Sequence, residues 1–165
     1  MTLSAELKKL ILRKPALTLA VAESLTAGQV QARIAAVSGA SDYFLGGITA
    51  YNLEQKVRQL GVNRAHARSV NCVSQRVAVE MAAGAAKLFG SDLALATTGY
   101  AERAPKQKVN VPHAWWAICH RMRGGAVMVL SGQVEVPGAD RVTVQERVAD
   151  AVLTELVNYL RERQG

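Results

Sequence analysis

Two patterns of apolar residues alternate along the chain. Apolar residues three and four positions apart predict helices that begin near residues 3, 26, 52, 74 and 141. A short continuous apolar run predicts a buried strand over residues 17–22, and β-rich segments predict further strands over 44–51, 93–97, 113–120 and 126–136. Residues 121–125, Arg-Met-Arg-Gly-Gly, are typical of a hairpin turn, so we expect the last two strands to pair antiparallel.

The order of these elements predicts one α/β domain over residues 1–165. In this fold a mixed β-sheet is flanked by helices in a three-layer sandwich. Residues 98–112 contain glycine, proline and mixed charges without any periodicity, which predicts a loop long enough to suggest a function.

Composition narrows the class of protein. The chain is 50% apolar and 20% charged, which favours a globular core and excludes disordered, coiled-coil and fibrous chains. Cys72 and Cys119 lack zinc-ligand spacing, and we expect both thiols to be reduced. The apolar runs fall short of the ~20 residues that span a bilayer, and the N-terminus carries no signal-peptide pattern. We therefore predict a cytoplasmic protein with no membrane partner.

The charge of the chain raises the question of nucleic-acid binding. The formal net charge is +7 and the pI is about 9.8. The basic residues are scattered, however, and aromatic residues that stack on bases make up only 5% of the chain. A basic surface that attracts small anionic substrates explains the charge equally well. We regard a nucleic-acid partner as the weaker interpretation.

The first candidate site follows the strand predicted over residues 17–22. Ligands in α/β folds bind beyond the carboxyl ends of strands, beside helix N-termini. Ser24 lies at such a junction, where its hydroxyl is expected to be accessible. Thr26 and Gln29 form a capping-box pattern, which predicts that Thr26 caps the next helix. On spacing alone, an ordinary turn serine remains the more common interpretation of Ser24.

The second junction leads from the strand over residues 44–51 into a helix. Asn52 and Gln55 form another capping-box pattern, which places Tyr51 and Lys56 at the two positions that meet at a helix entrance. Burial and the helix dipole both disfavour a charged amine there. The pKa of a lysine must fall from ~10.4 to about 7 before the amine is an efficient base at neutral pH. The alternative is a solvated surface lysine.

Together these junctions suggest acyl transfer. Lys56 would take the proton of Ser24, the oxygen would attack an acyl carbon, and nearby N–H groups would stabilise the oxyanion. This chemistry requires no metal or organic cofactor. Histidine is the weaker candidate for the base, because the histidines have no evident serine or aspartate partner spacing: His66, His113 and His120.

A third element is the turn over residues 137–141, Pro-Gly-Ala-Asp-Arg, which leads into the last helix. Arg141 offers a planar fork for a phosphate or carboxylate. The alternative is that Asp140 caps the helix while Arg141 pairs with Asp140 or another surface acid.

At these residues the chain resembles the CinA C-terminal domain family, the nicotinamide-nucleotide amidohydrolases. Residues 22–28, AESLTAG, are similar to the family signature AES-C-TGG, and residues 39–56 to its GSSxxFxGGxxxYxNExK motif. The family's later motifs follow in the same order, at residues 60–62, 73–74, 81–85 and 139–141. The resemblance spans nearly the whole chain.

The resemblance implies an enzyme of pyridine nucleotide salvage that converts nicotinamide mononucleotide to nicotinic acid mononucleotide and ammonia. It implies a catalytic set made of a serine nucleophile at Ser24, a lysine base at Lys56 and a nearby tyrosine at Tyr51. It also implies self-association and places Arg141 near the substrate phosphate. The remaining residues expected to contact the substrate are Thr26, Gly28, Thr98 and Gly99.

The chain departs from the family pattern chiefly in one region. Residues 98–105, TGYAERAP, stand where the family has TGIAGPxGG, and residues 110–115 replace its KPVGTV motif. Tyr100, Glu102 and Arg103 bring bulk and charge into a glycine-rich, ligand-approaching segment. The alternative function is therefore a paralogue that keeps the fold, has lost catalysis, and acts as a ligand-binding or regulatory protein.

Overall fold

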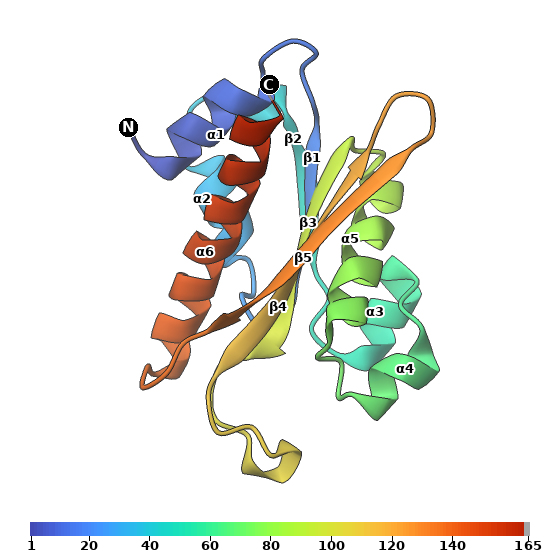
Figure 1. Cartoon of the computed structure of the whole chain (residues 1–165), viewed down its shortest axis with the longest axis vertical. Coiled ribbons are helices and arrows are strands. Elements are labelled where there is room, and N and C mark those ends of the chain that lie inside the picture. The colour runs from blue at the N-terminus through green and yellow to red at the C-terminus, as the bar shows by residue number, and fades with distance from the viewer. Residues whose placement is uncertain (164–165) are drawn as a thin grey trace.

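The computed structural model describes residues 1–163, in which a five-stranded sheet lies between two layers of helices (Figure 1). The strands are β1 (Leu19–Glu23), β2 (Phe44–Thr49), β3 (Leu93–Tyr100), β4 (His113–Arg121) and β5 (Val127–Glu135). The α-helices are α1 (Leu3–Ile11), α2 (Gln29–Ala35), α3 (Leu53–Leu60), α4 (Arg64–Ser69), α5 (Gln75–Phe89) and α6 (Arg141–Glu162). Two 3₁₀ helices, η1 (Ala40–Asp42) and η2 (Pro105–Gln107), lie in the connections.

The sheet is mixed, with the strand order β2-β1-β3-β4-β5. Strand β1 pairs in parallel with both β2 and β3, so the carboxyl ends of these three strands meet at one edge. Strand β4 runs antiparallel to β3 and to β5, which confirms the predicted hairpin. The α/β three-layer architecture is therefore the one that the sequence predicts.

The helices divide between the two faces of the sheet. Helices α1, α2 and α6 cover one face, and α3, α4 and α5 cover the other (Figure 1). Large aliphatic side chains fill the first layer, whereas alanines dominate the second. Small side chains let α5 approach its neighbours closely, and a side chain at Gly84 would collide with the main chain of Leu60 at the end of α3. Close packing here fixes the position of α3 relative to the sheet.

Side-chain caps define where two of the important helices begin. The Asn52 side chain accepts a hydrogen bond of 2.9 Å from the Gln55 N–H, as predicted. Asp140 likewise accepts from the Thr143 N–H at 2.9 Å, so this carboxylate caps α6. The prediction for Thr26 is wrong: α2 begins at Gln29, after Gly28 in the left-handed conformation, and the Glu23 carboxylate accepts from its first N–H groups. The buried Thr26 hydroxyl instead lies 2.8 Å from Thr97 Oγ1.

Further differences from the sequence prediction lie in short or irregular segments. Helix α4 was not expected, because it has six residues and only Ala67 is buried. Residues 98–100 extend β3 instead of opening a loop, and η2 interrupts the segment that follows. The extended conformation of residues 98–100 depends on pairing with β4, and local periodicity does not predict it. Within residues 1–163, no helix has both the length and the hydropathy needed to cross a bilayer.

Candidate active site

Ser24 lies directly after β1, at the edge where the parallel strands end. Its side chain is 6% exposed. The preceding residue, Glu23, is fully buried, and its carboxylate accepts hydrogen bonds of 2.9 and 3.0 Å from the N–H groups of Val30 and Gln31 in α2. These bonds pair N–H groups that the start of a helix leaves unsatisfied. Glu23 thereby ties the end of β1 to α2, and the turn that carries Ser24 is held at both ends.

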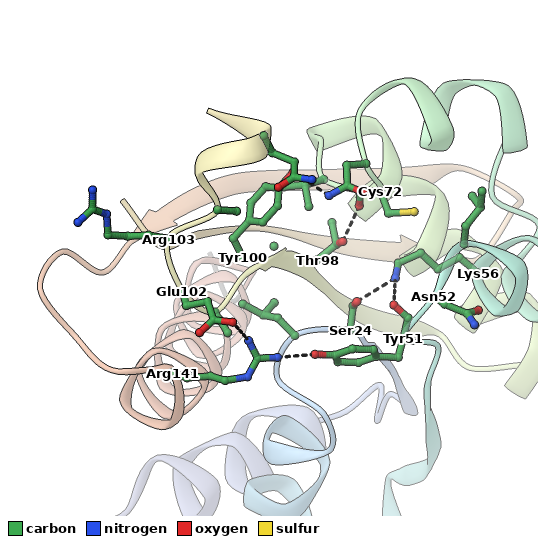
Figure 2. Close-up of a pocket in the computed structure, with 18 residues that line it drawn as sticks. Ser24, Tyr51, Asn52, Lys56, Cys72, Thr98, Tyr100, Glu102, Arg103 and Arg141 are labelled. Atoms are coloured by element: carbon green, nitrogen blue, oxygen red, sulfur yellow. Dashed lines mark hydrogen bonds and ion pairs between the residues drawn. The ribbon is translucent and has the colours of Figure 1, made fainter. Parts of the chain in front are cut away.

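Lys56 approaches Ser24 from the second turn of α3. Its amine lies 2.8 Å from Ser24 Oγ and 3.0 Å from the Tyr51 carbonyl oxygen (Figure 2). The Ala50 carbonyl oxygen also lies 2.9 Å from the amine. The residue is 1% exposed. Burial lowers the pKa of Lys56 to about 8, an effect that the Cys72 side chain opposes in part. The two sequence junctions are thus brought together in hydrogen-bond contact.

Tyr51 reaches both ends of the site. Its carbonyl contacts Lys56, but its side chain is directed away from that amine and is 53% exposed. The Tyr51 hydroxyl accepts a hydrogen bond of 2.7 Å from Arg141 Nη2. Arg141 Nη1 donates at 2.8 Å to the carboxylate of Glu102, which stands between β3 and η2. Arg141 therefore pairs with a surface acid other than Asp140, and Asp140 caps α6, which agrees with the alternative interpretation of this turn.

These residues line one cavity of about 450 Å³. Figure 2 shows Ser24 and Lys56 at one end, and Arg141 with Glu102 at the other. Thr98 and Gly99 line the wall from β3, and the Thr98 hydroxyl donates at 2.6 Å to the Cys72 carbonyl. A side chain at Gly99 would collide with the main chain of β4, so strand pairing itself requires glycine there.

Two residues expected to contact substrate lie elsewhere. Thr26 and Gly28 are absent from the described lining of the cavity. Thr26 is buried against Thr97, and Gly28 has a φ of 96°, a conformation that glycine adopts readily. Both residues shape the turn that carries Ser24. Within the described lining, neither residue reaches the cavity.

Several residues of the cavity lining are not predicted to belong to the site by the sequence. Glu102 was noted only as a departure from the family pattern, and its pairing with Arg141 spans 39 positions. Asn71 and Cys72 lie in left-handed backbone conformations, and the Asn71 amide donates at 3.2 Å to the Tyr100 hydroxyl. Burial raises the pKa of the free Cys72 thiol, which does not favour a thiolate nucleophile. No local signal links these positions to the site.

The arrangement has the elements of nucleophilic catalysis. A hydroxyl touches a buried amine whose pKa is low enough for about one molecule in ten to be neutral at pH 7. Within residues 1–163, no group of three His, Cys, Asp or Glu side chains is placed to bind a metal ion. A serine hydroxyl in contact with an amine of lowered pKa is an arrangement that can support acyl transfer to serine.

Comparison with known proteins places this chain in a family. Residues 2–160 match the CinA C-terminal domain family. A CinA-like protein of Chlorobium limicola is 34% identical over 156 residues, which cover 94% of this chain and 36% of that protein. A CinA-like protein of Picosynechococcus sp. is 50% identical over 91 residues, or 55% of this chain and 22% of that protein. The chain thus matches only about a fifth to a third of the length of these curated relatives.

Solved structures agree with this assignment over the whole fold. The crystal structure of the competence damage-inducible protein A from Klebsiella pneumoniae superposes with a TM-score of 0.85 at 25% identity, covering 98% of this chain and 97% of that one. A CinA superfamily protein from Escherichia coli has a TM-score of 0.79 at 26% identity, covering 94% and 86%. The chain belongs to the CinA C-terminal domain family, among proteins of the competence-damage inducible type.

Proposed function

We propose that the chain is an amidohydrolase of the nicotinamide mononucleotide deamidase type, with Ser24 as nucleophile and Lys56 as base. The observation that carries the proposal is the 2.8 Å contact between the Ser24 hydroxyl and the buried Lys56 amine, inside a cavity of about 450 Å³. Family membership supports it, because the residues that resemble the family signatures include both members of this pair. The proposed reaction converts nicotinamide mononucleotide and water to nicotinic acid mononucleotide and ammonia.

The three contacts of Lys56 match the three N–H donors of its charged form, which donates to Ser24 Oγ and to two carbonyl oxygens. The proposed base is the neutral amine formed when the proton facing Ser24 is lost. Such an amine has two N–H donors and one lone pair, and the carbonyl oxygens of Ala50 and Tyr51 accept the two N–H groups. The lone pair is then left for the proton of Ser24. Fixed acceptors therefore orient the base toward its nucleophile before substrate binds.

The reaction runs in two halves. In the first, Lys56 takes the Ser24 proton, Oγ bonds to the amide carbon, and backbone N–H groups of the turn after Ser24 stabilise the oxyanion. The carbon–nitrogen bond breaks, Lys56 returns the proton to the leaving nitrogen, and ammonia departs from an acyl-serine ester. In the second half, water gives a proton to Lys56 and attacks the ester carbon. The carboxylic acid is released, and the proton returns to Ser24.

The other end of the cavity would hold the phosphate. Arg141 presents a planar guanidinium there, and the Tyr51 hydroxyl lies 2.7 Å from it. Thr98 and Gly99 line the wall between the two ends. The nicotinamide would then lie with its amide toward Ser24.

Ammonia release from nicotinamide mononucleotide by the purified chain tests the proposal. We expect Ser24→Ala and Lys56→Ala each to lower kcat by a factor of at least ~10³, because the two groups act as a unit. The exposed residues Ser69 and Lys87 provide matched controls, Ser69→Ala and Lys87→Ala, which should leave kcat unchanged. Turnover that survives both site variants would refute the proposed roles.

A second candidate function is a ligand-binding or regulatory protein that has lost catalysis. The pairing of the Glu102 carboxylate with Arg141 favours this second function, because the guanidinium that would bind the substrate phosphate already has an anionic partner. Absence of turnover on nicotinamide mononucleotide and on related amides, with ligand binding retained, would support this second function.

A further inference from the structure

Arg141 already holds an anion that belongs to the chain itself. We propose that Glu102 is a specificity-determining residue that competes with the anionic group of a ligand for Arg141. The inference rests on the proposed function in naming that group as a phosphate. Glu102 then sets how strongly the site prefers a phosphorylated amide over the same amide without phosphate.

The hydrogen bonds of Arg141 explain the competition. A guanidinium recognises phosphate through two parallel N–H donors. Here Nη1 donates to Glu102 at 2.8 Å, and Nη2 donates to the Tyr51 hydroxyl at 2.7 Å. Each terminal nitrogen therefore uses one of its two N–H groups within the protein, and a phosphate that binds this side of the guanidinium competes with the Glu102 carboxylate. The Tyr51 hydroxyl can stay, because it is able to donate its own proton to a phosphate oxygen.

Charge makes Glu102 distinctive in this cavity. Among the described residues of the lining, Glu102 alone is acidic, whereas Lys56, Arg103 and Arg141 are basic. Figure 2 shows the Arg103 side chain extending away from Glu102 and Arg141, so it does not take part in their pairing. Removing the Glu102 charge would leave Arg141 as an uncompensated cation at the far end of the site.

The exposure of the pair shows that the carboxylate is displaceable. The side chains of Arg141 and Glu102 are 44% and 63% exposed. Exposed ion pairs contribute little to stability, whereas a phosphate group carries up to two negative charges and fits the guanidinium fork. Glu102 and Arg141 also line a second cavity of about 470 Å³, so the departing carboxylate has open space beside it. Glu102 therefore weakens phosphate binding without blocking it.

Binding measurements on a protein that cannot turn substrate over test this inference. Calorimetry would compare Ser24→Ala with the double variant Ser24→Ala/Glu102→Gln, using nicotinamide mononucleotide, nicotinamide riboside and inorganic phosphate as probes. We expect the double variant to bind the mononucleotide and phosphate roughly two- to fivefold more tightly, the range that an exposed ion pair supports. Affinity for the riboside should not change, because this probe has no phosphate.

The controls separate this inference from the proposed function. Glu6 forms another ion pair, with Arg161 at the C-terminal end of α6, the end of the helix away from Arg141, so Ser24→Ala/Glu6→Gln should match Ser24→Ala for all three probes. Glu102→Ala provides a second variant that removes the same charge. An equal change for mononucleotide and riboside, no change for either, or no binding of phosphate would overturn the inference. Ammonia release by the chain with Ser24 intact is measured separately, and its absence would refute only the proposed reaction.

Discussion

Tyr51 accepts a hydrogen bond of 2.7 Å from Arg141, although the two residues are 90 positions apart. The same tyrosine offers its carbonyl to Lys56 at 3.0 Å. Its hydroxyl and its main chain therefore contact opposite ends of one cavity. From these contacts we propose that the Tyr51 hydroxyl serves ligand binding and that its main chain positions the proposed base.

Tyr51→Phe tests that division. The variant keeps the carbonyl beside Lys56 and removes only the hydroxyl at Arg141. A hydrogen bond to a charged group contributes ~1.5 kcal/mol or more, so we expect KM for nicotinamide mononucleotide to rise by about tenfold. Steady-state kinetics should show kcat within about threefold of the parent. A large fall in kcat with KM unchanged would instead make the Tyr51 hydroxyl part of the chemical step.

The pH dependence of turnover should follow Lys56. Burial lowers the pKa of this amine to about 8, and only the neutral amine can take the proton of Ser24. We therefore expect kcat/KM to rise about tenfold per pH unit below pH 7 and to level off above pH 8 to 9. Initial rates of ammonia release across this range measure the profile. A rate that is flat from pH 6 to pH 9 would contradict Lys56 as the base.

The free energy of unfolding should also depend on the protonation of Lys56, and this contribution should increase with pH. The pKa of this amine is about 8 in the fold and ~10.4 in the unfolded chain. Between these two values the unfolded chain binds more protons, so the free energy of unfolding rises with pH there. Below pH 8 the Lys56 amine is protonated in both the folded and the unfolded state. The folded state is then destabilised by the full desolvation cost of the buried charge. The difference between the folded and unfolded pKa values corresponds to about 3 kcal/mol in the free energy of unfolding.

Comparison with Lys56→Met isolates this contribution from other titrating groups. Urea unfolding of both proteins at pH 7 and pH 10 should show the parent gaining about 2 to 3 kcal/mol relative to the variant. A parallel pH dependence of the two proteins would mean that Lys56 is not held with a lowered pKa.

Local sequence patterns predicted the layers of the fold and the two junctions that meet in the site. The apolar runs and the Asn52 cap are properties of neighbouring residues, so they could be recognised without tertiary structure. The Thr26 cap was wrong for the same reason. Its pattern is local, but the hydroxyl bonds to Thr97 in the adjacent strand, and this tertiary contact prevails.

The far end of the site could not be predicted in this way. Glu102 and Arg141 come from segments that meet only when β3, its following loop and the start of α6 are in place. Spacing along the chain carries no information about such a pair. The turn over residues 137–141 indicates Arg141 as an anion-binding residue. The carboxylate that pairs with it is brought there only by the tertiary fold.

Glu23 offers a test of how the Ser24 turn is held. This fully buried carboxylate accepts the N–H groups of Val30 and Gln31, one on each oxygen. In Glu23→Gln, one of these acceptors becomes an NH₂ group that faces a backbone donor and leaves it unpaired. An unsatisfied buried donor costs about 1 to 3 kcal/mol, and urea unfolding should show a loss of that size. Because the turn loosens, kcat should fall at least about tenfold while the affinity for inorganic phosphate is retained.

The exposed Glu54 provides the control, because it pairs with Arg64 at the surface. Glu54→Gln should change the free energy of unfolding by less than about 0.5 kcal/mol. Equal effects of the two substitutions would show that Glu23 does not position Ser24.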